Sequence, residues 1–328
     1  MKNKPKIIVI IGQTSTGKSN FAVQIALQLS SGQAKTKCEI ISADSRQVYK
    51  GMNLGTGKIT KKEMRGIPHH LLDVASPSRT FTVSQFQIAT KSAIAKIVTK
   101  GKVPILCGGT GFYIDAVVNN MVLPKVKPNL KLRKELSKKS KEELFKILKK
   151  IDPERIKTID KNNPVRLIRA IEIAEALGKV PVVRQGLTTE LRTSPPTPSP
   201  YKGEGQDSKY DVLKIGLTLP DEILKEKIYN RILARIKKGM LKEIQNLHDN
   251  GLSWKRMEAL GLEYRYGALF LQGKTSKQEM IEKLNTESWH YAKRQKTWFK
   301  RDTATLWIDP REIHEQAKAL KAVRDFLR

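Results

Sequence analysis

Cysteine, aromatic residues and long apolar runs are all scarce in this sequence. The chain holds 2 cysteines, and aromatic side chains make up 6% of its 328 residues. Cys38 and Cys107 lie inside apolar stretches typical of strands, so we expect buried free thiols and a reducing compartment rather than a disulfide. The apolar run Ile7 to Ile11 is far shorter than the ~20 residues of a membrane-spanning helix, and no small-residue cleavage site follows it. These absences predict a soluble, cytoplasmic protein with no membrane partner.

Acidic side chains are scarce relative to basic ones. The chain has 62 Lys and Arg against 32 Asp and Glu, which leaves a formal net charge of +30. A polyanionic partner is the first explanation, because each neutralised phosphate releases condensed counterions. The alternative is a lysine-rich genome that has loaded the surface with lysine. Because 39% of the residues are hydrophobic, the chain can bury a substantial core in one large or two modest domains.

Strands and helices are predicted to alternate along much of the chain. Strand patterns cover 6–11, 38–42 and 103–107, and each runs into a polar or glycine-rich turn. Helical patterns follow the first and third strands, and another helix ends at Gly101. A strand over 211–219, a long helix from Pro220 and a last strand at 305–308 come later. This order predicts an α/β fold with a parallel sheet whose sites lie at the carboxyl ends of its strands.

After about residue 118 the pattern changes to strongly basic helices. Ser140 and Glu143 have the spacing of a capping box, while Asp152-Pro153 and Asn163-Pro164 each place a capping residue before a first-turn proline. We therefore expect an all-helical insertion domain over about 119–199, within a core made of 1–118 and about 200–328. Residues 193–209 are rich in Pro, Ser and Gly and are predicted to form a flexible loop.

The sharpest motif is a phosphate-binding loop between the first strand and its helix. Residues 12–19 match G-x-x-x-x-G-K-S/T in the strand–loop–helix context that this motif requires. The glycines let the backbone curl so that successive N–H groups point at phosphate oxygens, Lys18 adds a cation, and Ser19 can ligate Mg²⁺. The motif predicts a P-loop NTPase-like core whose phosphate site is made of Gly12, Gln13, Thr14, Ser15, Thr16, Gly17, Lys18 and Ser19.

Asp44 is the acidic candidate that would work with this loop, since it directly follows the strand 38–42. It could hold a metal-bound water, as in NTP hydrolases and kinases, act as a base, or only cap a turn. The strand 103–107 offers no such acid, because it runs into Gly108-Gly109-Thr110. A plain ATPase is therefore disfavoured.

Six blocks, in order along the chain, carry a family resemblance. They are GQTSTGKS at 12–19, DSRQVYKGMNLGTGK at 44–58, PHHLLD at 68–73, GGTGFY at 108–113, NPVRLIRAIE at 163–172 and AKRQKTWFKR at 292–301. Together they resemble the tRNA dimethylallyltransferases in their bacterial form, without the zinc finger that eukaryotic relatives often add. The resemblance implies transfer of a dimethylallyl group from dimethylallyl pyrophosphate to N6 of the adenine 3′ of the anticodon, position 37. The phosphate loop would then hold pyrophosphate, with Mg²⁺ as cofactor.

The resemblance also implies catalytic roles. Asp44 becomes the base that takes a proton from N6, Thr110 a catalytic or substrate-orienting hydroxyl, and Arg235 the cation that reaches pyrophosphate. Arg235 lies in the long helix after Pro220, where an apolar stripe (Ile228, Ile232, Ile236, Met240) runs beside a basic one (Lys227, Arg231, Arg235, Lys238). From the pattern alone, a basic stripe is usually a solvated face.

For the RNA, the resemblance implies contacts in three segments. Asp44, Ser45, Arg46 and Gln47 would bracket the target base. The anticodon stem-loop would be touched by Val165, Arg166, Leu167, Ile168 and Arg169. Lys293 and Arg294 belong to a basic segment interleaved with Trp289, Tyr291, Trp298 and Phe299, which suits single-stranded loops, although core packing is the alternative for each aromatic.

Three other functions fit part of the pattern. A nucleotide kinase or ATPase would not need a net charge of +30, and a non-catalytic RNA-binding protein leaves the intact GKS loop unexplained. A prenyltransferase acting on free AMP, ADP or ATP shares the loop and the base but has little use for a basic insertion. His69 and His70 precede a predicted strand with no further ligands at metal spacing, so no zinc site is expected. We expect a monomer.

Overall fold

The computed structural model describes residues 4–31, 36–178 and 209–328, which divide into two compact units. The first unit is Met1–Asn120 with Leu191–Arg328, and the second is Met121–Glu190. The insertion predicted over about 119–199 overlaps the second unit. The loop predicted over 193–209 lies outside the described residues except for Lys209.

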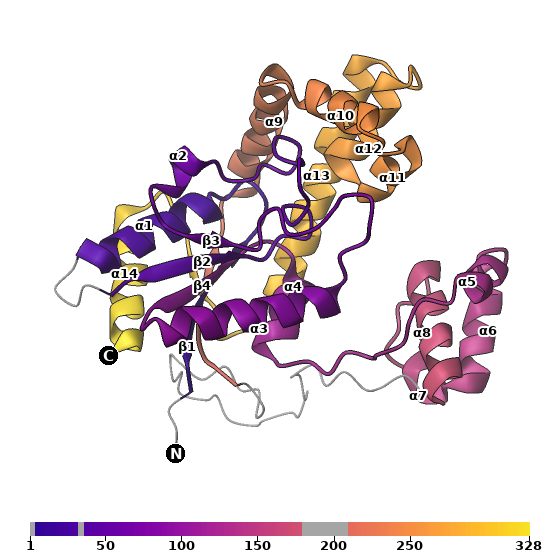
Figure 1. Ribbon diagram of the computed structural model, residues 1–328, viewed down its shortest axis with the longest axis horizontal. Helices are drawn as coiled ribbons and strands as arrows, with labels where there is room; N and C mark the ends of the chain where they lie inside the picture. The colour runs from indigo at the N-terminus through magenta and orange to yellow at the C-terminus, as the bar shows by residue number, and fades with distance from the viewer. Residues whose placement is uncertain (1–3, 32–35, 179–208) are drawn as a thin grey trace. The chain divides into compact units, whose positions relative to one another are not determined.

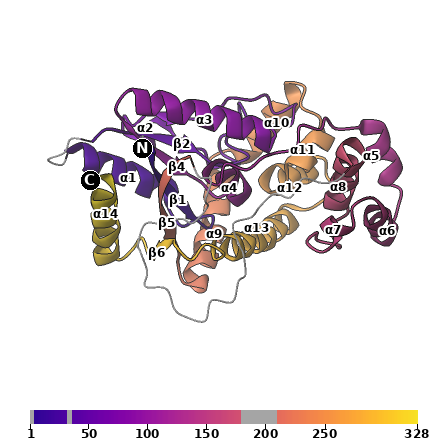
Figure 2. The same cartoon turned by 90° about the horizontal axis from the view of Figure 1, so that it is seen from below.

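In the described residues of the first unit, six parallel strands form one sheet in the order β3-β2-β4-β1-β5-β6 (Figures 1 and 2). The predicted α/β fold with a parallel sheet is confirmed. His69 and His70 do not precede a strand but form one, because their backbone pairs with Ile40 and Ile41. The strands are β1 (Lys6–Gly12), β2 (Cys38–Ser42), β3 (His69–His70), β4 (Val103–Cys107), β5 (Asp211–Leu217) and β6 (Leu306–Ile308).

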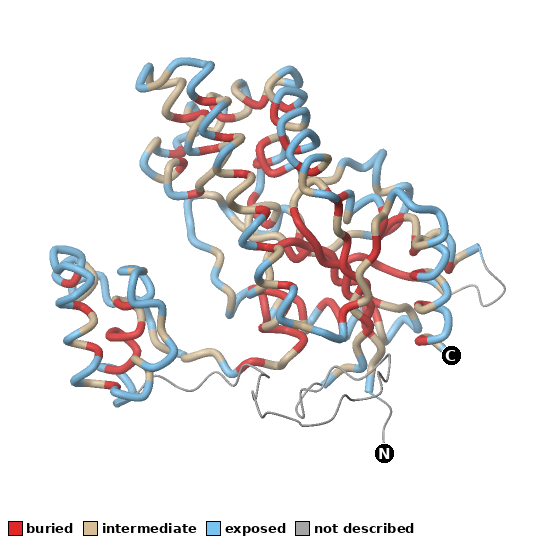
Figure 3. Tube along the Cα trace, turned by 180° about the vertical axis from the view of Figure 1, so that it is seen from behind, coloured by how far each residue is buried: buried red, intermediate tan, exposed pale blue. Residues whose placement is uncertain are grey.

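Helices cover both faces of this sheet (Figures 1 and 2). Successive strand residues point to opposite faces, so Ile8 and Ile10 of β1 pack with α1 (Lys18–Ser31) and α14 (Ile313–Leu327). Ile7 and Val9 pack instead with α3 (Val83–Thr99) and α4 (Gly111–Val118). The centre of the sheet is therefore buried on both sides (Figure 3), and it includes both free cysteines, as predicted.

The rest of the first unit is mainly helical. The predicted apolar stripe of the long helix divides at Gly239, which has a left-handed φ of 97° and separates Ile236 in α9 from Met240 in α10. Arg235 is buried, so it does not lie on the solvated face that is usual for a basic stripe, and its contact with pyrophosphate stays a prediction. The helices are α2 (Lys61–Met64), α9 (Asp221–Lys237), α10 (Met240–Asp249), α11 (Trp254–Leu260), α12 (Leu262–Leu271) and α13 (Lys277–Phe299).

The second unit is a helical bundle whose ends follow the predicted caps. The side chains of Ser140 and Glu143 form the capping box. Asp152 and Asn163 each precede a first-turn proline, and the side chain of each accepts a hydrogen bond from a backbone N–H of the first turn. Leucine and isoleucine side chains from these helices make a separate core. The helices are α5 (Leu130–Leu136), α6 (Lys141–Ile151), α7 (Pro153–Ile156) and α8 (Pro164–Leu177).

Candidate active site

The phosphate loop joins β1 to α1 at the carboxyl edge of the sheet. Gly12, Ser15 and Gly17 have φ values of 145°, 64° and 86°, so the backbone turns sharply between them. A side chain at residue 12 is excluded, because a Cβ atom would lie 2.4 Å from the carbonyl oxygen of Leu217. The hydroxyl of Thr16 and the ammonium of Lys18 both donate to the carbonyl of Gln13, at 2.8 and 2.5 Å. These bonds fix the loop in a curled form.

Lys18 is a cation held in a poorly solvated place. The pKa of its ammonium is lowered to about 8, mainly by burial. Cys107 and Asp44 act to raise this pKa and the nearby Arg231 acts to lower it, but burial outweighs them. An anion bound in the loop would favour the charged form, because opposite charge offsets the cost of desolvation. Lys18 is therefore suited to respond to a phosphate group.

Asp44 and Thr110 follow the neighbouring strands β2 and β4 and are joined through backbone groups. Oδ1 of Asp44 accepts hydrogen bonds from the backbone N–H groups of Arg46 and Gln47, at 2.8 and 3.2 Å. The N–H of Ser45 donates to Oγ1 of Thr110 at 3.0 Å. Asp44 thus caps a turn through Oδ1, while Oδ2 accepts no hydrogen bond from the described part of the chain. One carboxylate oxygen can serve the turn and the other a substrate.

Two arginines of α9 complete the side of the site next to the loop. Nη1 of Arg235 donates to the carbonyl of Gly55 at 3.2 Å and to Oε1 of Glu263 at 2.5 Å, while its Nη2 is buried without a partner among the described residues. Arg231 lies 3.4 Å from the hydroxyl of Ser15. Burial, followed by the charge of Arg235, lowers the pKa of Arg231 to about 10. Two close cations and an orphaned buried donor favour an anion here.

A small pocket opens between this arginine pair and the phosphate loop. It is lined by Thr14, Ser15, Arg231, Arg235 and Glu263 among others. Gly57 packs closely against Arg235, since a Cβ atom there would lie 1.8 Å from Nη2 of Arg235. The structure therefore brings Arg235 next to the loop, although the two are more than two hundred positions apart in the sequence.

Glu243 is a supporting residue that sequence reasoning missed. Its carboxylate accepts hydrogen bonds from the backbone N–H groups of Asn53, Leu54 and Gly55, and from the hydroxyl of Tyr264 at 2.7 Å. These bonds fix the loop whose Gly55 carbonyl receives Arg235. No local pattern could reveal this, because α10 meets a loop that is about 190 positions away in the sequence.

The segments predicted to contact RNA fall in both units. In the first unit, residues 44–47 lie at the site just described, and the side chain of Gln47 bonds to Ser42 and to the carbonyl of Gly57. Lys293 and Arg294 are exposed on α13. Of the aromatics in that helix, Phe299 packs in the core, so the core alternative is confirmed for Phe299. The indole N–H of Trp298 donates to Asp115 at 2.8 Å.

Residues 165–169 belong to α8 of the second unit and differ sharply in exposure. Val165 and Arg166 are exposed, whereas Leu167 is fully buried in that unit's core. Arg169 bonds to Glu172 and to the carbonyl of Val126. The side chain of Leu167 is therefore not available to contact RNA, contrary to the prediction for this segment. Ile168 also packs on that core.

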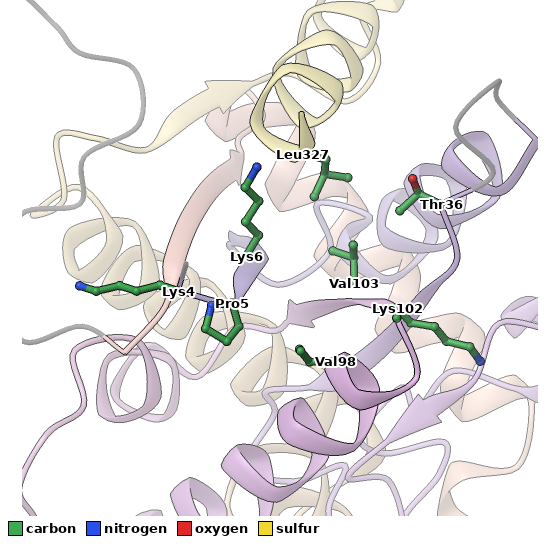
Figure 4. A pocket seen from close by; sticks show the side chains of 9 residues that line it. Lys4, Pro5, Lys6, Thr36, Val98, Lys102, Val103 and Leu327 are labelled. Carbon is green, nitrogen blue, oxygen red and sulfur yellow. The ribbon is translucent and has the colours of Figure 1, made fainter. Parts of the chain in front are cut away.

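A different hollow lies at the opposite edge of the sheet, near the amino ends of β1 and β4 (Figure 4). It is lined by three lysines (Lys4, Lys6, Lys102) and by small or apolar residues such as Pro5, Val98 and Leu327. It contains no carboxylate and none of the predicted site residues, so it is not the catalytic site.

Potential metal ligands are sparse across residues 4–31, 36–178 and 209–328. No cluster of three or more His, Cys, Asp or Glu side chains is arranged to hold a metal in these ranges. His70 is engaged by the buried carboxylate of Glu39, at 2.7 Å. None of the helices in the same ranges has the length and apolarity needed to cross a membrane.

Comparison with known proteins places this geometry in a family. The family model described as IPP transferase matches residues 47–302. A curated "tRNA dimethylallyltransferase 1" from Syntrophus aciditrophicus is 38% identical, with 98% of each chain covered. The full-length tRNA isopentenylpyrophosphate transferase of Bacillus halodurans has a similar structure, with a TM-score of 0.69 and 31% identity over 99% of this chain and 97% of that one.

A eukaryotic relative with a similar structure was solved as a dimethylallyltransferase acting on tRNA. Its TM-score is 0.75 and its identity 25%, over 98% of this chain and 79% of that chain. Both the sequence matches and the structural matches thus extend across the sheet and the helical unit. The chain belongs to the IPP transferase family, the family of the tRNA dimethylallyltransferases.

Proposed function

We propose that this protein transfers a dimethylallyl group from dimethylallyl pyrophosphate to N6 of adenine 37 in tRNA and releases pyrophosphate. One observation carries the proposal beyond family membership. A carboxylate and a hydroxyl, Asp44 and Thr110, are held together beside a phosphate loop whose far side carries one buried and one partly buried arginine. This arrangement offers an anion site for the leaving group and a base for the amine.

A nucleotide kinase or ATPase fits this geometry less well. Such enzymes hold Mg²⁺ with the hydroxyl of the phosphate loop and a further acidic residue. The neighbours of β1 are β4 and β5, which run into Gly108-Gly109-Thr110 and Thr218-Leu219-Pro220, without a carboxylate in either turn. Asp44 follows β2, one strand further away, and we assign it the role of the base.

The leaving-group side of the reaction needs cations. As the bond between the allylic carbon and the pyrophosphate oxygen breaks, negative charge grows on pyrophosphate. The loop N–H groups, Lys18, Arg231 and Arg235 are positioned to stabilise that charge. Because Arg235 is buried and Arg231 partly buried, their charges are less screened by water than those of exposed arginines.

The nucleophile side needs a base. A bond forms between N6 and the allylic carbon, and N6 must then lose one proton, which the carboxylate of Asp44 accepts. Oδ1 is anchored by the turn, so the proton is assigned to Oδ2. The hydroxyl of Thr110 accepts a hydrogen bond from the N–H of Ser45 and also bonds to the side chain of Tyr291, so its orientation next to the base is fixed.

Mg²⁺ is the cofactor that we propose, and the residues present fit it. The hydroxyl of Ser19 is exposed at the first turn of α1 and has no hydrogen-bond partner in the described part of the chain. Mg²⁺ in phosphoryl sites is commonly held by one or two protein groups together with substrate oxygens and waters, so a cage of carboxylates is not required. Bound there, Mg²⁺ would neutralise charge on pyrophosphate.

For tRNA, we propose that the exposed cations of α13 and of the second unit bind phosphates, with Lys293, Arg294 and Arg166 among them. The net charge of +30 supports a large polyanionic substrate over a free nucleotide. We propose a monomer, and tRNA as substrate favours the cytoplasm.

The test is incubation of the protein with labelled dimethylallyl pyrophosphate and one acceptor at a time. We expect label on tRNA, no label on the same tRNA with guanine at position 37, and no label on AMP, ADP or ATP. Transfer to free nucleotides alone would contradict the tRNA assignment. Turnover of ATP without any prenyl transfer would favour the kinase or ATPase instead.

A further inference from the structure

One face of α13 is turned toward the catalytic loops. Ala292, Gln295 and Trp298 are spaced by three residues and so lie along one side of the helix. The carbonyl of Ala292 accepts a hydrogen bond from the side chain of Gln13 in the phosphate loop. The ring of Trp298 covers Gly111, where a Cβ atom would lie 2.2 Å from it. The helix thus touches both the phosphate loop and the loop over 108–111.

Gln295 is the member of this face that touches both loops with one group. Its amide oxygen accepts from the backbone N–H of Thr14 at 2.7 Å, and its amide nitrogen donates to the carbonyl of Gly109 at 2.8 Å. The side chain is 5% exposed, so water does not compete for these bonds. Gly109 is shaped for the contact, since a Cβ atom there would lie 2.4 Å from the amide nitrogen.

The amide of Gln295 lies just beyond the last direct hydrogen bond between the two loops, where it can set the distance between them. The last direct bond from the turn after β4 to β1 runs from the N–H of Gly108 to the carbonyl of Ile10, at 3.0 Å. Beyond it no direct backbone hydrogen bond joins the two loops in the described residues, and the amide of Gln295 bridges them. A direct bond would bring Thr14 and Gly109 to about 2.9 Å, whereas an inserted amide holds them a fixed distance apart.

We propose that Gln295 is a positioning residue that sets the distance between the phosphate loop and the loop that carries Thr110. The inference rests on the proposed function, in which the allylic group is held on the first loop and the base lies behind the second. Gly109 precedes Thr110, and Thr110 bonds to Ser45 next to Asp44. Gln295 therefore connects the leaving-group side of the site to the base through a short series of bonds.

No other side chain of similar size can replace this amide. A glutamate lacks the donor for Gly109, a lysine lacks the acceptor for Thr14, and an asparagine is one methylene too short to make both bonds at once. Because transfer requires the allylic carbon and N6 in line, an error of about 1 Å in loop separation can cost about 100-fold in rate. Binding of pyrophosphate to the first loop alone does not require this distance.

The experiment compares Gln295→Ala and Gln295→Asn with wild type and with Gln316→Ala. Gln316 is a matched control, since its side chain also donates to a backbone carbonyl, that of Pro310, but in α14. We measure kcat for prenyl transfer, the dissociation constant of pyrophosphate and the melting temperature. We expect a kcat lower by about 10- to 100-fold in Gln295→Ala, a smaller loss in Gln295→Asn, and near-wild-type pyrophosphate binding and melting in both.

Amide hydrogen exchange gives a readout that does not depend on activity. Gln295→Ala should speed exchange in residues 12–16 and 108–111 together, and Gln316→Ala in neither. Faster exchange in the phosphate loop alone, or an unchanged kcat, would overturn the proposal. A wild-type protein that prenylates no tRNA would overturn the proposed function, while the exchange result would still decide whether Gln295 couples the loops.

Discussion

The catalytic site of the first unit and the helical bundle of the second unit are assembled in opposite ways. In the site, the hydrogen bond of Thr14 to Gln295 spans 281 positions, and that of Arg235 to Gly55 spans 180. In the bundle, the buried carboxylate of Glu172 is reached by Arg133, 39 positions away, and by Arg169, 3 positions away. The bundle is built largely from near neighbours, whereas the site exists only once distant segments have packed together.

The two regions also use buried charge differently. Burial by itself raises the pKa of Glu172, but hydrogen bonds from Arg133, Arg169 and the backbone of Asn129 outweigh it and lower the pKa to about 2. Its charge is therefore matched within the bundle. In the site, the three cations Lys18, Arg231 and Arg235 exceed the two carboxylates that act on them, Glu263 and Asp44. Excess charge is costly to a fold but useful for binding an anion.

The largest effect is expected at the base. Asp44→Asn keeps an acceptor for the turn N–H groups but cannot take a proton at neutral pH, so kcat should fall by about 100-fold or more. Single-turnover assays with dimethylallyl pyrophosphate and tRNA measure this, with tRNA affinity as the control. Near-wild-type turnover would show that Asp44 only caps the turn.

The next effect concerns the cation of the phosphate loop. Lys18→Ala should lower kcat/KM for dimethylallyl pyrophosphate by an amount equivalent to about 2 to 4 kcal/mol. Because the pKa of Lys18 is about 8 in the free protein, its charge is present below that pH and lost above it, so wild-type kcat/KM should decline as pH rises through about 8.

Lys18→Arg provides the control for this pH dependence. An arginine keeps its charge throughout this range, so the decline near pH 8 should vanish in the variant even if its overall rate is lower. A decline that persists unchanged in Lys18→Arg would assign the titration to another group.

A smaller effect, confined to stability, is expected in the second unit. Glu172→Ala leaves Arg133 and Arg169 without their shared partner and should lower the free energy of unfolding of the bundle by about 3 kcal/mol. Denaturant titration followed by helix content measures it.

The same carboxylate predicts a pH dependence. Since the pKa of Glu172 is about 2 in the folded protein and 4.5 in the ordinary state, its contribution is complete above about pH 4.5 and is lost as pH falls toward 2. A wild-type bundle that keeps its full stability down to pH 2 would contradict this role.

The smallest expected effect separates RNA binding from folding in α8. Arg166 is exposed with only a long ion pair to Asp160, at 3.9 Å, whereas Arg169 is tied to Glu172. Arg166→Ala should therefore raise KM for tRNA and reduce the slope of log affinity against log salt by about 1, without a change in melting temperature or in affinity for dimethylallyl pyrophosphate. An unchanged salt slope would place the RNA contact elsewhere.

Short-range sequence patterns predicted much of the fold and part of the site, namely the phosphate loop and the position of Asp44. The capping residues of α6, α7 and α8 were identified because a cap depends on residues three positions apart. The phosphate loop was identified because its function requires contiguous glycines. The pattern of α9 by itself left the place of Arg235 open, since helical spacing alone cannot tell a solvated cation from one buried against another segment.

The sequence by itself determined the parallel sheet, the phosphate loop, the position of Asp44 after its strand and the caps of the bundle, because each depends on short-range steric and hydrogen-bonding preferences. Only the tertiary structure decided that Gln295 bridges two loops, that Glu243 holds a third, and that Arg235 leaves one buried donor unpaired. The reason is physical. A polar side chain has many possible partners, including water, in an unfolded chain. Once packing excludes water, an unpaired polar group is costly, so the side chain keeps the partner that the packed segments bring next to it.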